Sequence, residues 1–300
     1  MTSKNTSLPW PQESSSESSD AFNWHHPSTN YCLDFHGNPT NAKLTVFSDG
    51  NHHMALEACC QKFLSLHPEV NDIFYATTPP GVLVNAIQSG ALQLGNLNIT
   101  AKPDIFISPE NIMSQLKQQA YIDEYTPLAE SLGNVMLVRK SNPKNIQSFE
   151  DLLRDDVRLF ISNPVTEKAS HDVYHNTILG LATEQNLNID AYKQKINSAT
   201  FGERIHHREC PQSLFNNDTD VAVIYYHLAL RYCRIFPDHF EMVHFNGSTS
   251  TNEPESTAAN ETTIYYIGVV NNEGWGEAFK TFMLSSDATD LYKQHGLGSA

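Results

Sequence analysis

The chain has few basic residues and no long apolar segment. It carries 19 Lys and Arg against 34 Asp and Glu, a formal net charge of −15 over 300 residues. This excess of negative charge argues against a nucleic-acid groove or a surface for anionic membranes. No apolar run approaches the roughly 18 residues that a membrane-spanning helix needs, so we predict no membrane insertion. Any anion site must be built locally, from backbone N–H groups and a few side chains.

The cysteines form no recognisable framework. The chain has five of them, an odd number, and no CxxC spacing, while Cys59 and Cys60 are too close together for an ordinary bridge. A disulfide-stapled fold and a zinc ribbon are therefore not expected. We interpret the cysteines mainly as buried thiols. Cys210 is the exception to follow, because it lies beside a polar segment that includes two histidines and an arginine.

The N-terminus lacks a secretory signal. Its first residues, MTSKNTSLPWPQESSSESSDAF, contain no apolar core of the usual length. As written, the chain is expected in the cytoplasm, and a periplasmic location requires another export route. Residues 1–40 are rich in Ser, Asn and Pro, which predicts a disordered tail of little consequence for stability. Trp10 and Trp24 are the residues able to pin that tail to the body.

Order is expected from Lys43 onward, in a strand–turn–helix pattern. Residues 44–47 and 70–75 are short β-rich runs, and helices are predicted at 53–66 and 82–89. This alternation is typical of a parallel α/β sheet. Turns rich in small residues follow each strand and open onto a helix N-terminus, where backbone N–H groups can approach a bound group.

The same pattern continues to the C-terminus. Further strands are predicted at 104–108, 133–138, 157–161 and 264–270, and further helices at 113–120, 149–153, 170–182, 189–195, 277–284 and 288–295. Residues 246–263 form a polar, low-complexity loop that precedes the last strand.

The stretch from Ile205 to Tyr226 brings polar residues to the end of a buried strand. It begins with His206, His207 and Arg208, after which Pro211 is expected to open a short helix. The apolar run 221–224 predicts a buried strand that ends at Tyr225. Ligands bind such sheets at the carboxyl ends of their strands, so Tyr225 and Arg208 are predicted to form two walls of one pocket.

Seven segments occur in an order that resembles a known family. They are LTVFSDGN (44–51), PPGVLVNAIQSGAL (79–92), PDIFISPEN (103–111), LGNVMLVRKSNP (132–143), VRLFISNP (157–164), DVAVIYYHLAL (220–230) and AFKTFMLSSDATDLYKQHGL (278–297). Over roughly residues 43–297 the chain resembles the molybdate-binding, or more broadly oxyanion-binding, solute receptors of ABC transporters, which have the type 2 periplasmic-binding fold.

The resemblance implies an α/β protein of two lobes with a ligand cleft between them. Lobe 1 would comprise residues 41–128 and about 265–300, and lobe 2 residues 129–264. Hinge motion is expected near 126–135 and 238–266. The implied function is capture of a small anion by a monomer that delivers it to the membrane component of an ABC transporter, with no catalytic residue and no cofactor.

The resemblance also implies where the ligand would bind. The positions that correspond to the family's pocket are Asn51, His52, Thr78, Gly81, Thr166, Ser170, His207, Arg208 and Tyr225. The family normally holds a tetrahedral dianion with neutral hydroxyls and backbone N–H groups. Imidazoles and a guanidinium in their place favour a different anion, such as a carboxylate, which Arg binds through two parallel hydrogen bonds.

Other interpretations of these residues remain open. Histidines occur 14 times, so His52, His53, His206 and His207 could equally be solvated or buried without a ligand, and Arg208 could form an ion pair. A transition-metal protein would use these histidines with His171 and Cys210. An enzyme would need Cys210 and His207 as a thiolate–imidazole pair. A cytosolic ligand sensor would keep the fold without a transporter.

Overall fold

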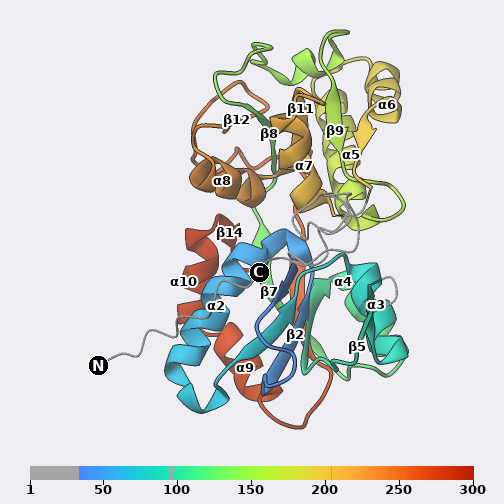
Figure 1. The fold of residues 1–300 in the computed structure, drawn as a ribbon. Helices are drawn as coiled ribbons and strands as arrows, with labels where there is room; N and C mark the ends of the chain where they lie inside the picture. Colours follow the sequence, from blue (N-terminus) through green and yellow to red (C-terminus); the bar gives the residue numbers. More distant parts are fainter. Residues whose placement is uncertain (1–33, 95–96, 204) are drawn as a thin grey trace, which may run out of the picture.

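The computed structural model describes residues 34–94, 97–203 and 205–300, which form two lobes, each built on its own β-sheet (Figure 1). The strand order is β1-β3-β2-β6-β13-β7-β14 in the sheet of lobe 1 and β10-β9-β11-β8-β12 in the sheet of lobe 2. Helices cover both sheets, so the predicted two-lobed α/β fold is confirmed. No helix in the described ranges is long and apolar enough to cross a membrane.

The sheet of lobe 1 is mixed rather than parallel. Its centre is parallel, as predicted: β2 (Leu44–Ser48), β3 (Ile73–Ala76) and β6 (Ile105–Pro109) precede α2 (His53–Leu66), α3 (Pro80–Ser89) and α4 (Glu110–Gln118) respectively. Antiparallel strands flank this centre: β1 (Phe35–His36), β13 (Ile264–Val269), β7 (Tyr125–Ser131) and β14 (Leu297–Gly298). A short hairpin of β4 (Leu92–Leu94) and β5 (Leu97–Ile99) follows α3. The helices α9 (Gly276–Met283) and α10 (Ser286–Gln294) complete the lobe.

Lobe 2 has a five-stranded sheet with helices before and after its buried strands. Its strands are β8 (Asn134–Arg139), β9 (Leu159–Ile161), β10 (Thr200–Phe201), β11 (Val221–Tyr225) and β12 (Phe240–Val243). Its helices are α5 (Lys168–Glu184), α6 (Ile189–Asn197), α7 (His206–Phe215) and α8 (Tyr226–Ile235), with a 3₁₀ turn at Phe149–Leu153. The core is continuous, because β8, β9 and β11 are buried along their length apart from Arg139.

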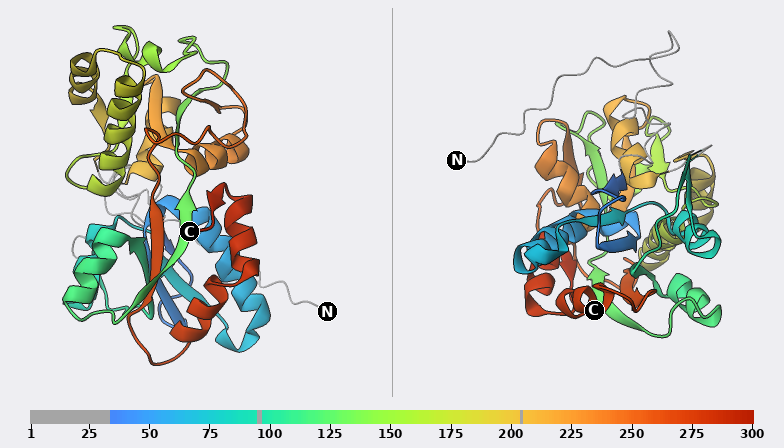
Figure 2. Two further views of the ribbon diagram at one scale, coloured as in Figure 1. Left: turned by 180° about the vertical axis from the view of Figure 1, so that it is seen from behind. Right: turned by 60° about the horizontal axis from the view of Figure 1, so that its bottom comes forward.

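The chain passes between the lobes twice, along two segments that run side by side (Figure 2). The first joins β7 to β8 through Gly133, whose φ of 85° is one that side chains rarely adopt. The second leads from β12 through the predicted polar loop into β13. Asn260 ties the two together: its Oδ1 accepts the backbone N–H of Asn134 at 2.7 Å, and a Cβ on Gly133 would lie 2.7 Å from its Nδ2. A glycine is therefore required at this crossing.

The prediction that Pro211 opens α7 was wrong. The helix begins at His206 and contains Pro211 in its interior. A proline there cannot donate to the carbonyl four residues earlier, which belongs to His207. The hydroxyl of Tyr232, on α8, donates to that carbonyl instead. This substitute donor explains how the helix continues through the proline and fixes α7 against α8.

Ordered structure begins earlier than Lys43, contrary to prediction. Phe35 and His36 form β1, which pairs antiparallel with β3, and Asp34 is fully buried. Residues 34–40 therefore belong to the folded body. Trp10 and Trp24 lie outside the described residues, as does Cys32, one of the five cysteines interpreted mainly as buried thiols.

Candidate functional site

The carboxyl ends of three adjacent strands of lobe 1 supply polar groups to the interface with lobe 2. The register aligns Phe47 with Ala76 and Ser48 with Ile107, so β3, β2 and β6 end side by side. The residues that follow or end these strands are Thr77 and Thr78 after β3, Asp49 after β2, and Ser108 in β6. Each of these side chains is at most 1 % exposed, which places a polar layer under lobe 2.

Lobe 2 contributes the first turns of α5 and α7 and the end of β11. Glu167 and Ser170 lie at the start of α5, and both are buried. The amide Nδ2 of Asn51 donates to Oγ of Ser170 at 3.1 Å, a direct hydrogen bond between residues of the two lobes. Tyr225 ends β11, and its hydroxyl lies 2.8 Å from Oγ1 of Thr263 in the second crossing segment.

Several buried polar atoms of this region have no hydrogen-bond partner within the described structure. They include Oγ1 of Thr78, Oγ of Ser108, the hydroxyl of Tyr265 and Oδ2 of Asp49. Buried polar groups are nearly always paired, since an unpaired one costs about 1–3 kcal/mol. Functional sites are where such groups persist, because a bound ligand can satisfy them.

Asp34 occupies the cationic side of the interface. Its Oδ1 lies 2.9 Å from Nε2 of His207 and 3.1 Å from a terminal nitrogen of Arg208, and the carboxylate is fully buried. Thr77 adds a hydroxyl donor at 3.2 Å. Burial by itself raises the pKa of Asp34, but His207 and Arg208 outweigh it and leave the pKa below its usual value. The chain's own carboxylate therefore compensates the charge of Arg208.

Gly50 allows His207 to approach lobe 1. A Cβ at position 50 would lie 2.3 Å from Cε1 of His207 and 2.3 Å from the carbonyl oxygen of Thr77. No side chain fits there without displacing the backbone. The imidazole of His207 also faces His53, with ring centroids 5.2 Å apart. The glycine thus determines how closely α7 packs on the loop after β2.

Burial shifts the acids and the histidines of this region in opposite directions. It raises the pKa of Asp49 to about 6 and that of Glu167 to about 8, although Glu167 accepts the backbone N–H of His206 at 3.1 Å. It lowers the pKa of His52 and His206 to about 3. At neutral pH these two imidazoles are uncharged and Glu167 is largely protonated. The hydroxyls of Thr78, Ser108 and Ser170 are neutral, whereas Asp49, with a pKa of about 6, is mostly ionised at neutral pH.

The structure gathers most, but not all, of the predicted site residues. Lining the interface are Asn51, Thr78, Ser170, His207, Arg208 and Tyr225. His52 instead points into lobe 1, where its nitrogens lie 3.0 Å from the hydroxyls of Ser48 and Tyr292. Gly81 and Thr166 line a cavity of about 400 Å³ between α3 and α4 of lobe 1 and the loop before α5 of lobe 2.

Five interface residues were not among the predicted ones: Asp34, Asp49, Ser108, Glu167 and Tyr265. Ser108 ends a predicted strand and Asp49 closely follows another, so the rule that ligands bind at the carboxyl ends of strands could have found them. Asp34 had no such signal, because it lies in a segment predicted to be disordered.

The described residues give little support to the metal and enzyme interpretations. No three His, Cys, Asp or Glu side chains converge on a common point within the described ranges. His171 and His175 stack on α5 at 5.8 Å, and Nδ1 of His171 is bonded to the carbonyl of Ser162. Cys210 is fully buried, and burial raises the pKa of its thiol, the opposite of what a nucleophile needs.

Comparison with known proteins identifies relatives of the fold. The sequence model of a family described as bacterial extracellular solute-binding protein matches residues 44–298. No curated protein sequence matches the chain. Among solved structures, the sulfate-binding protein SubI from Mycobacterium tuberculosis superimposes with a TM-score of 0.64 at 17% identity, covering 86% of each chain.

Two further structures are similar to 86% of this chain. The periplasmic molybdate-binding protein of Azotobacter vinelandii has a TM-score of 0.59 and 14% identity, with 99% of its own length covered. PEB3 of Campylobacter jejuni bound to L-phospholactate has a TM-score of 0.60 and 13% identity, with 100% covered. At these identities the likeness establishes the fold.

Proposed function

Because the chain belongs to the bacterial extracellular solute-binding proteins, we propose that it captures a small oxyanion between its two lobes. The solute would be held by neutral donors: the hydroxyls of Thr78, Ser108 and Ser170 and the amide of Asn51. The observation that carries this proposal is the pair of buried hydroxyls, on Thr78 and Ser108, that have no partner within the described structure. A fully ionised oxyanion can accept a hydrogen bond from each of these hydroxyl and amide groups and has no hydrogen to donate in return.

The state of Arg208 favours a compact oxyanion over a carboxylate held by two parallel hydrogen bonds. Its guanidinium faces Asp34, so its charge is already compensated by the chain. The neutral hydroxyl and amide donors would suit a dianion that is desolvated by many hydrogen bonds rather than by one counter-charge. Proteins of the same fold whose names mention sulfate, molybdate and L-phospholactate support this solute class.

The setting we propose is extracytoplasmic, in contrast to the cytoplasmic location expected from the N-terminus. The family is described as extracellular, and the N-terminal residues on which that expectation rested lie outside the described part. The protein would act as a monomer and pass its solute to the membrane component of an ABC transporter. Closure would use the two crossing segments as hinges.

The test is calorimetry of the full chain with sulfate, molybdate and phosphate. Thr78→Val and Ser108→Ala each remove one hydroxyl at nearly constant shape. Each should weaken binding of the preferred oxyanion by about ten- to a hundredfold, the range for hydrogen bonds to a charged group. Thr183→Val is the matched control, because Thr183 is exposed on α5 and bonds only to its own helix.

If the double variant Thr78→Val/Ser108→Ala bound the preferred oxyanion with wild-type heats of binding, these hydroxyls would not be part of the site. Absence of any response to the three oxyanions in the wild-type protein would reject the solute class.

A further inference from the structure

A second cavity lies outside the proposed oxyanion site, between α7 and α8 of lobe 2. Its volume is about 360 Å³, within the range of small-molecule sites. Residues of α7, of α8 and of the turn after α8 form most of its lining. His53, from lobe 1, and His207 close its inner end. The cavity is therefore built largely by one lobe and does not contain the hydroxyls of Thr78 or Ser108.

One wall of this cavity is a cluster of aromatic rings. Phe215 meets His239 edge-on at 5.1 Å, and Phe236 meets Phe240 edge-on at 6.0 Å. Phe215 and Phe236 are nevertheless 55% and 42% exposed. Large rings that pack against one another and stay accessible offer edge and face contacts to a flat apolar group.

Arg231 supplies a positive charge to the same cavity. Arg231 is half-buried on α8 and forms no ion pair with a carboxylate among the described residues. Arg139, Arg154, Arg158 and Arg208 each face at least one Asp. In a chain with 34 acids against 19 basic residues, an arginine left without a carboxylate beside an open aromatic wall points to an anionic partner.

We propose that this cavity binds a small aromatic carboxylate, with its ring against Phe215, Phe236 and Phe240 and its carboxylate on Arg231. A guanidinium binds a carboxylate through two parallel hydrogen bonds, and the apolar wall binds the ring that an inorganic oxyanion lacks. A volume of 360 Å³ accommodates one aromatic ring with a short substituent but is too small for a folded protein segment. Arg208, which pairs with Asp34, also lines this cavity, but none of the donors proposed for the oxyanion does.

The test uses benzoate as the probe, with the full-length protein and saturation-transfer NMR followed by titration. Benzamide, which keeps the ring and loses the charge, and acetate, which keeps the charge and loses the ring, should each bind at least about tenfold more weakly. Arg231→Gln should weaken benzoate binding by about tenfold or more. Phe236→Ala should weaken benzoate and benzamide by a similar factor.

The control variant is Arg234→Gln. Arg234 lies one turn further along α8 and donates to the backbone carbonyl of Gln294 at 2.7 Å, outside the cavity. It should leave benzoate binding unchanged. Oxyanion binding between the lobes should be unchanged in Arg231→Gln, so the two proposals fail separately. Equal benzoate affinity in Arg231→Gln and wild type, or no benzoate binding to the wild-type protein, would overturn the inference.

Discussion

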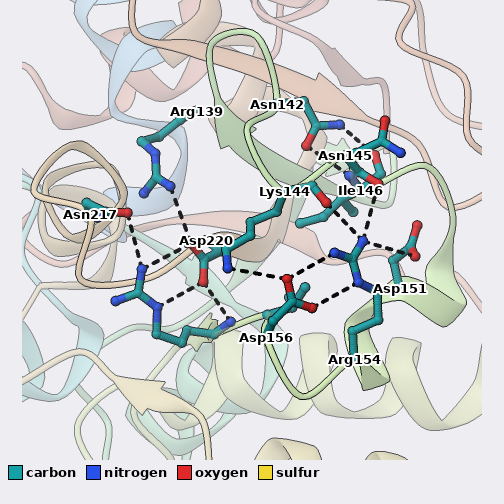
Figure 3. Close-up of polar contacts among 12 residues, drawn as sticks. Arg139, Asn142, Lys144, Asn145, Ile146, Asp151, Arg154, Asp156, Asn217 and Asp220 are labelled. Atoms are coloured by element: carbon teal, nitrogen blue, oxygen red, sulfur yellow. Dashed lines mark hydrogen bonds and ion pairs between the residues drawn. The ribbon is translucent and has the colours of Figure 1, made fainter.

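The buried carboxylates at the two ends of strand β11 differ in how completely they are paired. At its start, Asp220 is fully buried and accepts from Arg139 and Arg158, so that each of its oxygens is bonded (Figure 3). At its far end lies the interface between the lobes, where Asp49 leaves one oxygen unpaired and Glu167 is largely protonated. The first arrangement holds lobe 2 together. The second leaves hydroxyl donors, on Thr78 and Ser108, that an oxyanion can satisfy, whereas the unpaired oxygen of Asp49 is an acceptor that an oxyanion cannot satisfy.

Charge pairing shows the same difference. Burial by itself raises the pKa of Asp220, but Arg158 outweighs it and the pKa lies below its usual value. The neighbouring Arg154 lies between Asp151 and Asp156 (Figure 3). Among the interface carboxylates that the structure describes, Asp34 has cationic partners of this kind, and those partners come from the other lobe. Paired charges therefore join segments within lobe 2 and, through Asp34, the two lobes.

The largest expected effect comes from Glu167. Its pKa is raised from 4.5 to about 8, so the folded protein keeps its proton while the unfolded chain loses it. Stability is therefore lost as pH rises from about 4.5 to 8, by an amount on the order of 3–5 kcal/mol. Glu167→Gln should abolish most of this loss. About 2 kcal/mol of this loss falls between pH 6.5 and 8, where urea unfolding between pH 6.5 and 9 measures it. The remainder falls below pH 6.5, where the histidines of the unfolded chain also take up protons.

Glu150→Gln is the control for that experiment, because Glu150 is exposed. It should retain the wild-type dependence on pH. If Glu167→Gln and wild type lost stability equally over this range, Glu167 would not be protonated at neutral pH.

Removing the carboxylate of Asp220 at the start of β11 should lower the free energy of unfolding by nearly as much. Asp220→Ala leaves two guanidinium groups and the backbone N–H of Arg158 without their acceptor. We expect a loss of about 3 kcal/mol in the free energy of unfolding, with oxyanion binding preserved. Chemical denaturation measures it. Asp156→Ala, at an exposed carboxylate of the same cluster, should unfold close to wild type.

Removing the charge of Asp34 should loosen the interface. Asp34→Asn keeps the shape of the side chain and deprives His207 and Arg208 of their anion. We expect a loss of about 1.5–3 kcal/mol and a larger radius of gyration by X-ray scattering, as the lobes separate. Asp190→Asn, at an exposed site on α6, is the control. An unchanged radius and stability would show that the contact does not hold the lobes together.

The smallest effect on stability is expected at Thr78. Thr78→Val removes a buried hydroxyl without a described partner, so the ligand-free protein should be as stable as wild type or slightly more stable, by less than about 1 kcal/mol. Differential scanning calorimetry in oxyanion-free buffer measures it. A clear loss of stability would indicate that the hydroxyl is already paired in the absence of solute.

Local patterns were sufficient to predict much of the fold. The helix predicted at 53–66 is confirmed at His53–Leu66, because its apolar spacing and its flanking turn residues agree. The strand before Tyr225 and the polar loops after β2 and β3 were also correct. Helix α8 was missed, since it starts directly after β11 with no turn residue between them. Strands β8 and β13 were predicted, but their antiparallel pairing was not, because periodicity does not encode the direction of pairing.

The sequence by itself determined the α/β alternation and the polar turns that follow β2 and β3, because those features depend on neighbouring residues. Only the tertiary structure decided which charges are compensated. Asp34 meets His207 across 173 residues of chain, and Tyr232 replaces the hydrogen bond that Pro211 cannot make. Such pairings depend on how two lobes pack, and burial then sets the pKa of each group. No spacing along the chain contains that information.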